Sequence, residues 1–327
     1  MNKWLCGVLF FLGTYAQAQD YSQRADVQAF VQQFADKHEK NAADILAIIA
    51  PAKRQQSILD AIAKPAERVL TWGDYQRIFI EPKRLEQGVQ FWRENRELVE
   101  RLAEQYQVAP EIILAIIGVE TRYGRVMGNY KVLDALLTLG FDYPPRATFF
   151  RSQLEQFLLL VEEQGFNAQS VKGSYAGAMG YGQFIAGSYR AYAVDGDDDK
   201  RIDILHNTAD AIASVANYFV RHGWQADGLV AIALPEQKVD KLLLSAMPKP
   251  EKPSKTVAHY RQAGVVIPEQ ISDTAKATLM ALETERGTQY WLGFNNFYVI
   301  SRYNHSHLYS MAVHQFSQLL RLHVDMP

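Results

Sequence analysis

The stretch from Pro110 to Thr121 restricts the fold of this chain more than any other part of the sequence. Pro110 suits the first turn of a helix, and the positions that follow are apolar almost without interruption as far as Val119. A helix that is apolar on all sides has to be covered by other elements. The chain has 327 residues, 48% of them apolar, so it can supply that cover. The sequence therefore predicts a folded protein with this helix in its core.

The net charge and the aromatic content limit the classes of partner that we expect for this chain. The formal net charge is −2, whereas proteins that bind nucleic acids or anionic membranes carry a basic excess. We therefore expect neither kind of partner. Aromatic residues make up 12% of the chain. Many belong to the core, but tyrosines near polar motifs also suit carbohydrates, whose apolar ring faces stack on aromatic rings.

Residues 1–18 have the pattern of a secretory signal peptide. Lys3 precedes an apolar run from Trp4 to Gly13, and Ala16-Gln17-Ala18 forms a small-x-small cleavage site. The run is too short for a stable membrane anchor, although an uncleaved N-terminal anchor is the alternative. Cys6, the only cysteine, lies in this segment. We expect an exported mature chain without cysteine, disulfide or lipid.

Hydrophobic spacing predicts a mainly helical (α+β) protein. Helical patterns lie at 27–34, 45–49, 86–106, 111–121, 132–139, 147–164, 208–222 and 306–322. Segments rich in Thr, Val, Tyr and Phe predict strands at 229–234, 265–267 and 288–300. The predicted division is an N-terminal helical domain at 19–107, a core at 108–224, a small β-rich subdomain at 225–300, and a C-terminal helix at 301–327 that completes the helical part.

Glu120 is an acidic residue at the end of the apolar helix, and Thr121-Arg122-Tyr123-Gly124 follows it. Apolar surroundings disfavour the charged form of a carboxyl group, so we expect its pKa to be raised. Cleavage of a glycosidic bond needs such a protonated acid beside the leaving oxygen. Position alone also allows a structural glutamate that pairs with Arg122 or Arg125.

Residues 173–184 are rich in glycine. No strand precedes them and no Lys-Ser/Thr pair ends them, as a phosphate-binding loop requires. A glycine-rich turn lets the backbone approach a sugar, and Gln183 offers both a donor and an acceptor. A tight turn between helices is the structural alternative.

Residues 195–206 follow the spacing of an EF-hand calcium loop. The ligand positions, including one backbone carbonyl, fall on Asp195, Asp197, Asp199, Arg201 and Asp203. Two positions depart from that pattern, because Lys200 replaces the usual glycine and His206 the bidentate glutamate. The loop predicts Ca²⁺ as its ion, and a solvated acidic turn is the alternative.

The segment 301–309 mixes polar and aromatic residues that could line a sugar groove. His305 and His307 alternate within it, but the sequence offers no third metal ligand beside them. We therefore interpret both as surface histidines.

Taken in this order, the motifs resemble the lytic murein transglycosylase B family over almost the whole mature chain. The most specific matches are Glu-Thr-Arg-Tyr-Gly at 120–124 and Ala-Gly-Ala-Met-Gly-Tyr-Gly-Gln-Phe at 176–184. Shorter matches lie at 79–82, 91–92, 133–136, 216–219, 222–224 and 302–304. The resemblance implies a periplasmic enzyme with a lysozyme-like catalytic core, an α-domain, a small β-domain and an EF-hand-like loop.

The reaction implied by the resemblance is the non-hydrolytic cleavage of the β-1,4 bond between N-acetylmuramic acid and N-acetylglucosamine in peptidoglycan. Glu120 would protonate the leaving oxygen. As a carboxylate it would then take the proton from the muramoyl C6 hydroxyl, which attacks C1 and leaves a 1,6-anhydro end. The sequence shows no obvious second catalytic carboxylate, since Asp134 and Asp142 lie in segments that we interpret as structural.

The resemblance also carries over substrate-binding positions, at Ser174, Gln183, Tyr303, Asn304, Tyr309 and Arg146. Arg146 matches a basic position that would meet the substrate peptide or a carboxylate. Pro145 stands where relatives often have a second arginine, which implies weaker contacts with the peptide.

Two other functions fit parts of the sequence. A hydrolytic muramidase or chitinase on the same scaffold would use water in place of the C6 hydroxyl. A non-catalytic, calcium-dependent cell-wall-binding protein would use the loop but not Glu120. The intact motif around Glu120 favours the transglycosylase. We expect peptidoglycan strands as the partner, no cofactor other than Ca²⁺, and a monomer.

Overall fold

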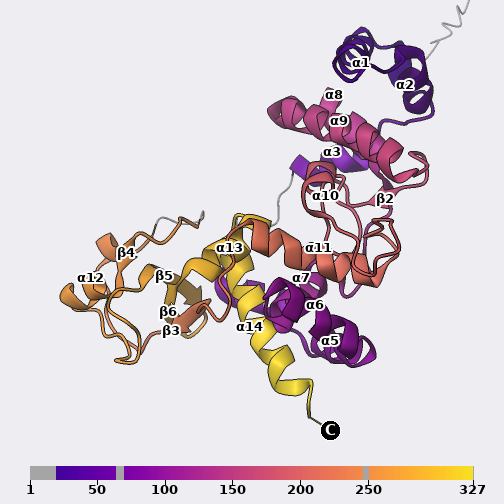
Figure 1. The fold of residues 1–327 in the computed structure, drawn as a ribbon. Coiled ribbons are helices and arrows are strands. Elements are labelled where there is room, and N and C mark those ends of the chain that lie inside the picture. Colours follow the sequence, from indigo (N-terminus) through magenta and orange to yellow (C-terminus); the bar gives the residue numbers. More distant parts are fainter. Residues whose placement is uncertain (1–19, 64–69, 246–249, 327) are drawn as a thin grey trace, which may run out of the picture.

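The computed structural model describes residues 20–63, 70–245 and 250–326, and the predicted signal peptide lies outside them. Most of this chain is helical, and two small antiparallel sheets complete the fold (Figure 1). The predicted mainly helical class with a small β-rich part is confirmed.

The first half of the chain is helical apart from one short strand. In chain order its elements are η1 Tyr21–Gln23, α1 Ala25–His38, α2 Ala42–Ile49, α3 Gln56–Ala63, α4 Trp72–Phe79, α5 Pro82–Glu94, α6 Arg96–Tyr106, α7 Pro110–Thr121, β1 Tyr130–Lys131, α8 Val132–Asp142, η3 Pro144–Arg146 and α9 Ala147–Gln164.

The second half contains the remaining strands. Its elements are β2 Lys172–Gly173, α10 Ala186–Tyr192, α11 Thr208–Arg221, β3 Ala231–Ala233, η4 Lys241–Leu243, β4 Lys255–Thr256, α12 Val257–Gln262, β5 Lys276–Thr284, β6 Gly287–Gly293, α13 Asn295–Tyr303 and α14 His307–His323.

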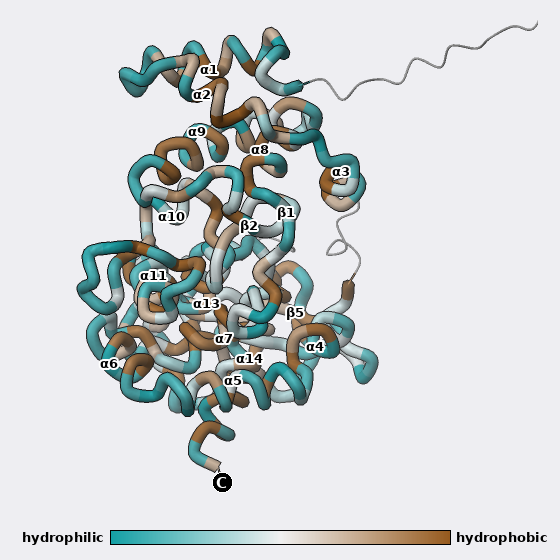
Figure 2. The backbone as a smooth tube through the Cα atoms, turned by 90° about the vertical axis from the view of Figure 1, so that its right-hand side faces the viewer, coloured by the Kyte–Doolittle hydropathy of each residue, from teal (hydrophilic) through white to brown (hydrophobic). Residues whose placement is uncertain are grey.

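Helix α7 is the centre of the larger hydrophobic cluster. Every residue from Ile112 to Val119 is buried, and α5, α6, α11 and α14 pack around the helix. In Figure 2, hydrophobic stretches of the chain lie close together around α7. The predicted buried helix is therefore confirmed, and four helices from distant parts of the chain provide its cover.

A second cluster joins the N-terminal helices α1, α2 and α3 to α8, α9 and α10. Its centre is formed by α8 and α9, which pack along each other. Tyr303, at the end of α13, packs against both clusters. The two helical bodies therefore meet near the C-terminal end of α7.

The larger sheet has the strand order β3-β6-β5-β4, and all its neighbours are antiparallel. It extends away from the helical body on one side (Figure 1). One face of the sheet is closed by a small cluster that includes Leu279, Leu292 and Val257. The smaller sheet pairs β1 with β2, so that Tyr130 lies opposite Gly173.

Two predicted elements differ from the structure in type or length. The helix predicted over 86–106 is interrupted at Asn95, whose side-chain amide and backbone N–H both donate to the carbonyl of Phe91. The strand predicted over 288–300 ends at Gly293, and Asn295–Tyr303 is helical. Buried Asn296 explains the change, because its amide bonds to the backbone of Gln225 and Gly228. Tertiary contacts of this kind override a local preference for strand.

The β-rich part was only partly predicted. No strand forms at 265–267, while β5 was missed, because its sequence Lys-Ala-Thr-Leu-Met-Ala-Leu-Glu-Thr lacks the usual enrichment in branched and aromatic residues. Within the predicted strand at 229–234, the observed strand β3 spans only Ala231–Ala233.

Among the residues described, no single helix is both long enough and apolar enough to span a membrane. Helices α6 and α7 pass that test only as a pair, and they meet at an angle of 114°.

Candidate functional site

Glu120 lies in the last turn of α7 and is partly exposed, unlike the residues before it. The backbone then turns sharply, because Arg122, Tyr123 and Gly124 all adopt left-handed conformations, with φ of 51°, 61° and 80°. A Cβ atom at Gly124 would lie 2.4 Å from the ring of Tyr181, so only glycine fits there. The local sequence thus ends the helix directly after Glu120 and brings the following turn against the glycine-rich segment.

Tyr309 approaches Glu120 from α14. Its hydroxyl donates a hydrogen bond of 2.6 Å to Oε1 of Glu120, although the two residues are 189 positions apart. Burial raises the pKa of Tyr309 well above its usual value, and the negative charge of Glu120 acts in the same direction. Tyr309 therefore remains a protonated donor to the carboxyl group at any physiological pH.

Tyr303 is a second phenol near Glu120, and its side chain is partly buried. Burial raises its pKa well above the usual value, with the charge of Glu120 as a further cause. Its hydroxyl donates to the carbonyl of Gly182 at 2.6 Å, and its ring packs against Phe184 and Tyr218. Tyr303 therefore fixes the glycine-rich segment to α13 beside the carboxyl group.

The glycine-rich segment folds back on itself. Ser174 Oγ accepts hydrogen bonds from the N–H groups of Ala176 and Ala178, which leaves its own proton to be donated elsewhere. Gln183 adopts a left-handed φ of 51°, and its side-chain amide donates to the carbonyls of Met127 and Gly180. The segment is thus a rigid backbone turn with a hydroxyl and an amide on it.

Thr121 links this segment to the helix that carries Glu120. Its side chain is buried, and Oγ1 lies 2.9 Å from the carbonyl of Tyr181 and 3.1 Å from that of Ile117. The same oxygen accepts from the N–H of Gly124 at 3.0 Å. Sequence reasoning missed this residue, because its partner Tyr181 lies 60 positions away.

The sequence allowed an ion pair between Arg122 and Glu120, but the structure shows Arg122 paired with a different glutamate. The guanidinium of Arg122 forms an ion pair with Glu81 at the start of α5. Arg84, buried nearby, donates to the carbonyls of Ile78 and Phe79. Arg122 therefore ties the turn after Glu120 to the α4–α5 connection.

Two further predicted substrate positions lie at the ends of helices. Asn304 follows α13 in an extended conformation and is partly exposed. Arg146 is exposed at the start of α9, with its guanidinium over the rings of Phe149 and Phe150.

From the sequence we interpret both His305 and His307 as surface residues. That interpretation is wrong for His307, which is buried, and burial lowers its pKa to about 4.

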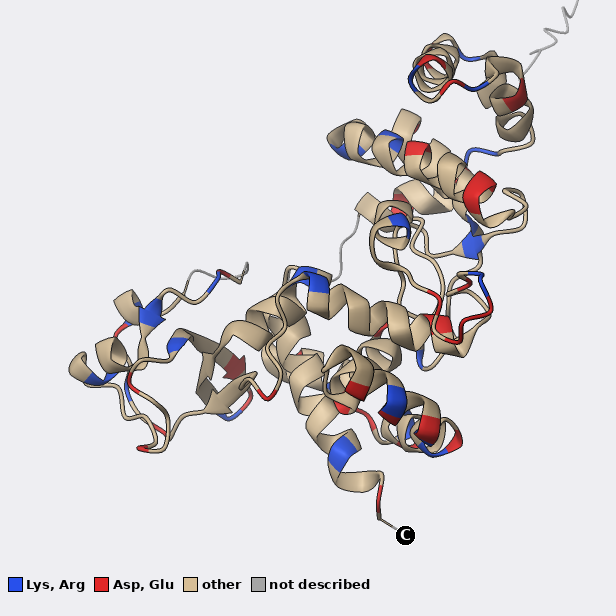
Figure 3. Cartoon of the chain, viewed as in Figure 1, with Lys and Arg blue, Asp and Glu red and all other residues tan. Residues whose placement is uncertain are grey.

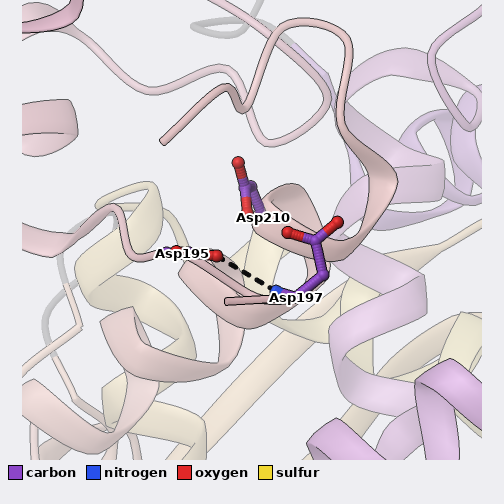
Figure 4. Close-up of side chains that lie close together, drawn as sticks. All are labelled: Asp195, Asp197 and Asp210. Atoms are coloured by element: carbon purple, nitrogen blue, oxygen red, sulfur yellow. Dashed lines mark hydrogen bonds between the residues drawn. The ribbon is translucent and has the colours of Figure 1, made fainter. Parts of the chain in front are cut away.

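The acidic loop lies beside α11, where acidic residues gather in Figure 3. Asp195 and Asp197 from the loop, and Asp210 from the first turn of α11, each place a carboxylate oxygen within 4.8 Å of the others (Figure 4). Asp210 is fully buried and accepts from the N–H groups of Gly196 and Asp203. Burial raises the pKa of Asp210, and the charges of Asp197 and Asp195 add to this effect. Three carboxyl groups this close favour a cation between them.

The other predicted ligands lie outside this group of three. Asp199 accepts from the N–H of Arg201, while Asp203 accepts from the N–H groups of Leu205 and His206. The unusual Lys200 adopts the left-handed φ of 69°, a conformation in which glycine is the usual residue. The loop thus keeps a tight turn at this position. Asp210 was missed because it lies beyond the twelve-residue spacing of an EF-hand loop.

Comparison with known sequences identifies related proteins over almost the whole chain. Residues 22–318 match the family described as Transglycosylase SLT domain. The chain is also 39% identical over 312 residues to the membrane-bound lytic murein transglycosylase B of Escherichia coli K12, covering 93% of this chain and 84% of the relative.

Solved structures agree with this result. The catenated lytic transglycosylase SltB1 of Pseudomonas aeruginosa superposes with a TM-score of 0.88 at 42% identity, covering 93% of this chain and 100% of that one. The lytic transglycosylase Slt35 of Escherichia coli in complex with calcium gives 0.84 at 38% identity, covering 94% and 96%. SltB3 of Pseudomonas aeruginosa in complex with NAG-NAM-pentapeptide gives 0.81 at 26%, covering 93% and 80%.

Proposed function

Since this chain belongs to the lytic murein transglycosylase B family and is a lytic transglycosylase that acts on peptidoglycan, we propose that Glu120 is its catalytic acid and base. The observation that carries the proposal is the hydrogen bond from Tyr309 to Oε1 of Glu120 at the partly exposed end of a buried helix. A phenol that stays protonated holds the carboxyl group in place in both of its protonation states.

The proposed reaction needs one carboxyl group and no water. Glu120 donates its proton to the glycosidic oxygen as the C1–O4 bond breaks, and positive charge develops at C1. The C6 hydroxyl of the same muramoyl unit then attacks C1, and its proton passes to the Glu120 carboxylate. The products are a strand with a free 4-hydroxyl and a strand with a 1,6-anhydro end, and Glu120 is again protonated. Apolar and aromatic surroundings help to keep water from C1.

The other two carboxylates considered in the sequence have structural partners, which supports a single acid and base. Asp134 accepts from the backbone of Lys53 and the side chain of Gln55. Asp142 pairs with Arg24 and accepts from Tyr21. Both carboxylates use these hydrogen bonds and ion pairs to join the N-terminal helical region to α8.

For the substrate, we propose that peptidoglycan strands bind at Ser174, Gln183, Tyr303, Asn304 and Tyr309. Ser174 has a hydroxyl proton to donate, and the two tyrosines fix the geometry beside Glu120. Arg146, exposed on its aromatic platform, suits a carboxylate of the substrate peptide. The related SltB3 was crystallised with NAG-NAM-pentapeptide, which supports a peptide-bearing glycan as ligand.

Replacing Glu120 with Gln removes the acid and base but keeps the size of the side chain. We expect turnover of purified peptidoglycan to fall by about 10²–10⁴-fold, as judged by mass analysis of the released muropeptides. The matched control is Glu97→Gln on the exposed face of α6, which should retain full activity. Reducing-end products from the wild type would instead identify a hydrolase, and no product from folded wild type would support the binding-protein alternative.

Thr121→Val removes the hydroxyl that joins α7 to Tyr181 without changing the volume. As a positioning residue, Thr121 should affect kcat more than KM, with a loss of about tenfold for a shift in Glu120 worth about 1.4 kcal/mol. Thr121→Ser should restore the rate. Thr138→Val is the control for stability, because Thr138 is also buried in a helix and accepts from the N–H of Gln55. Equal rate losses in the two valine variants would contradict a positioning role.

We also propose that the acidic loop binds a structural Ca²⁺ through Asp195, Asp197 and Asp210, with Asp199, Asp203 and the carbonyl of Arg201 as further candidate ligands. The carboxylate group supports this site, as does the complex of the related Slt35 with calcium. A bound ion would relieve the repulsion between the three carboxylates and fix the loop to α11.

Calcium at a concentration of about 100 times Kd stabilises a protein by about 2.7 kcal/mol, so calcium should raise Tm by several degrees relative to chelator. Asp197→Asn should remove most of that increase. Asp198→Asn is the matched control, since Asp198 is an exposed loop residue outside the carboxylate group and asparagine tolerates its left-handed φ of 63°. An unchanged Tm of the wild type in calcium would exclude a structural ion.

For localisation, we propose export to the periplasm with cleavage after Ala18. The support is the sequence pattern of residues 1–18, whereas the curated relative is described as membrane-bound. N-terminal sequencing of the protein from a periplasmic fraction should begin at Gln19. A chain that still begins at Met1 would indicate an uncleaved anchor.

A further inference from the structure

A cavity of about 830 Å³ lies at the first turn of α7, far from the candidate catalytic residue. The end of α6, the start of α7, the segment 224–231 and the last turns of α14 surround it. Glu111 lines this cavity, and Glu120 lies nine residues further along the same helix. At 1.5 Å per residue the two positions are about 13 Å apart along the axis. The cavity is therefore separate from the catalytic site.

The inner wall of the cavity is apolar. Val108, Ile112 and Ala231 are buried there. At its edge, Leu229 and Leu322 are 48% and 58% exposed. Exposed apolar side chains beside a hollow are typical of surfaces that bind another protein. The leucines come from the segment after α11 and from α14, so they stand on two different walls.

The charged residues around the cavity are mainly acidic. Four carboxylates and one guanidinium line it: Glu100, Glu104, Glu111, Asp227 and Arg321. Among the residues described, Glu104, Glu111 and Asp227 form no ion pair. Three carboxylates therefore face the cavity without a positive partner from this chain. With four carboxylates against one guanidinium, the lining has an acidic excess that favours basic side chains of a partner.

We propose that this cavity is the docking site for a partner protein, through a segment that carries lysine or arginine between apolar side chains. Apolar side chains of the partner would fill the inner wall and cover the two leucines. Basic side chains would lay their apolar stems over the same surface and place their charges beside the carboxylates. Charge complementarity of this kind selects the partner and accelerates its association.

The position of the site separates docking from catalysis. A partner bound at the first turn of α7 leaves the end of α7, with Glu120 and Tyr309, free for the glycan strand. The partner would therefore bring the enzyme to its substrate without covering the catalytic residues.

The test uses the full mature protein and a short fluorescent peptide of alternating leucine and lysine, at low salt and with chelator present. We expect saturable binding by fluorescence anisotropy. Neutralising the three unpaired carboxylates together, as Glu104→Gln, Glu111→Gln and Asp227→Asn, should weaken that binding by about tenfold or more, which corresponds to 1.4 kcal/mol. Leu229→Ser with Leu322→Ser should weaken it as well.

The matched control neutralises three exposed carboxylates elsewhere, as Glu39→Gln, Glu236→Gln and Glu269→Gln, and should bind the peptide like the wild type. Unchanged Tm and unchanged peptidoglycan turnover would show that all variants are folded. The proposal is overturned if the control weakens binding equally, if a leucine–glutamate peptide binds as well, or if the lysine peptide does not bind. Self-association of the wild type that the first triple variant abolishes would also overturn it, in favour of a second copy.

Discussion

Burial of an almost wholly apolar helix governs the arrangement of this molecule. Because α7 has no polar face between Ile112 and Val119, it has to be covered on all sides, and a single neighbouring helix cannot do this. Four helices surround it. Two of those helices precede α7 in the sequence and two follow it, so the C-terminal α14 closes a core begun by α5 and α6. Completion of this core brings α14 and its tyrosine to the end of α7.

The candidate catalytic site lies at the polar end of the same helix, where Glu120 stands. A carboxyl group beside a hydrophobic core requires hydrogen-bond partners, since an unpaired buried charge is costly. Tyr309 provides one partner directly, and Tyr303 keeps the glycine-rich segment next to it. Thr121 adds a buried hydrogen bond between that segment and the helix. The stability of the core and the geometry of the site therefore depend on the same contacts.

The opposite end of α7 and the acidic loop follow another pattern. In both places several carboxylates lie close together on the surface of one cavity or loop. In the loop the spacing is short and one carboxylate is fully buried, which suits a single ion. Around the cavity the carboxylates surround an apolar wall, which suits basic side chains on an apolar segment. The arrangement of the carboxylates thus separates the two proposed ligands, a cation at the loop and a basic protein segment at the cavity.

Local sequence was sufficient for features that depend on neighbours in the chain. The apolar run predicted α7, the residues after Glu120 predicted its end, and the regular spacing of aspartates predicted the acidic loop. These signals are readable because helix periodicity and loop ligands are set within about a dozen residues. Only the tertiary structure placed Tyr309 against Glu120, Tyr181 against Thr121 and Asp210 against the loop. It also made a helix of 295–303, where the composition favours a strand. Such outcomes depend on packing between segments far apart in the sequence, which no local pattern encodes.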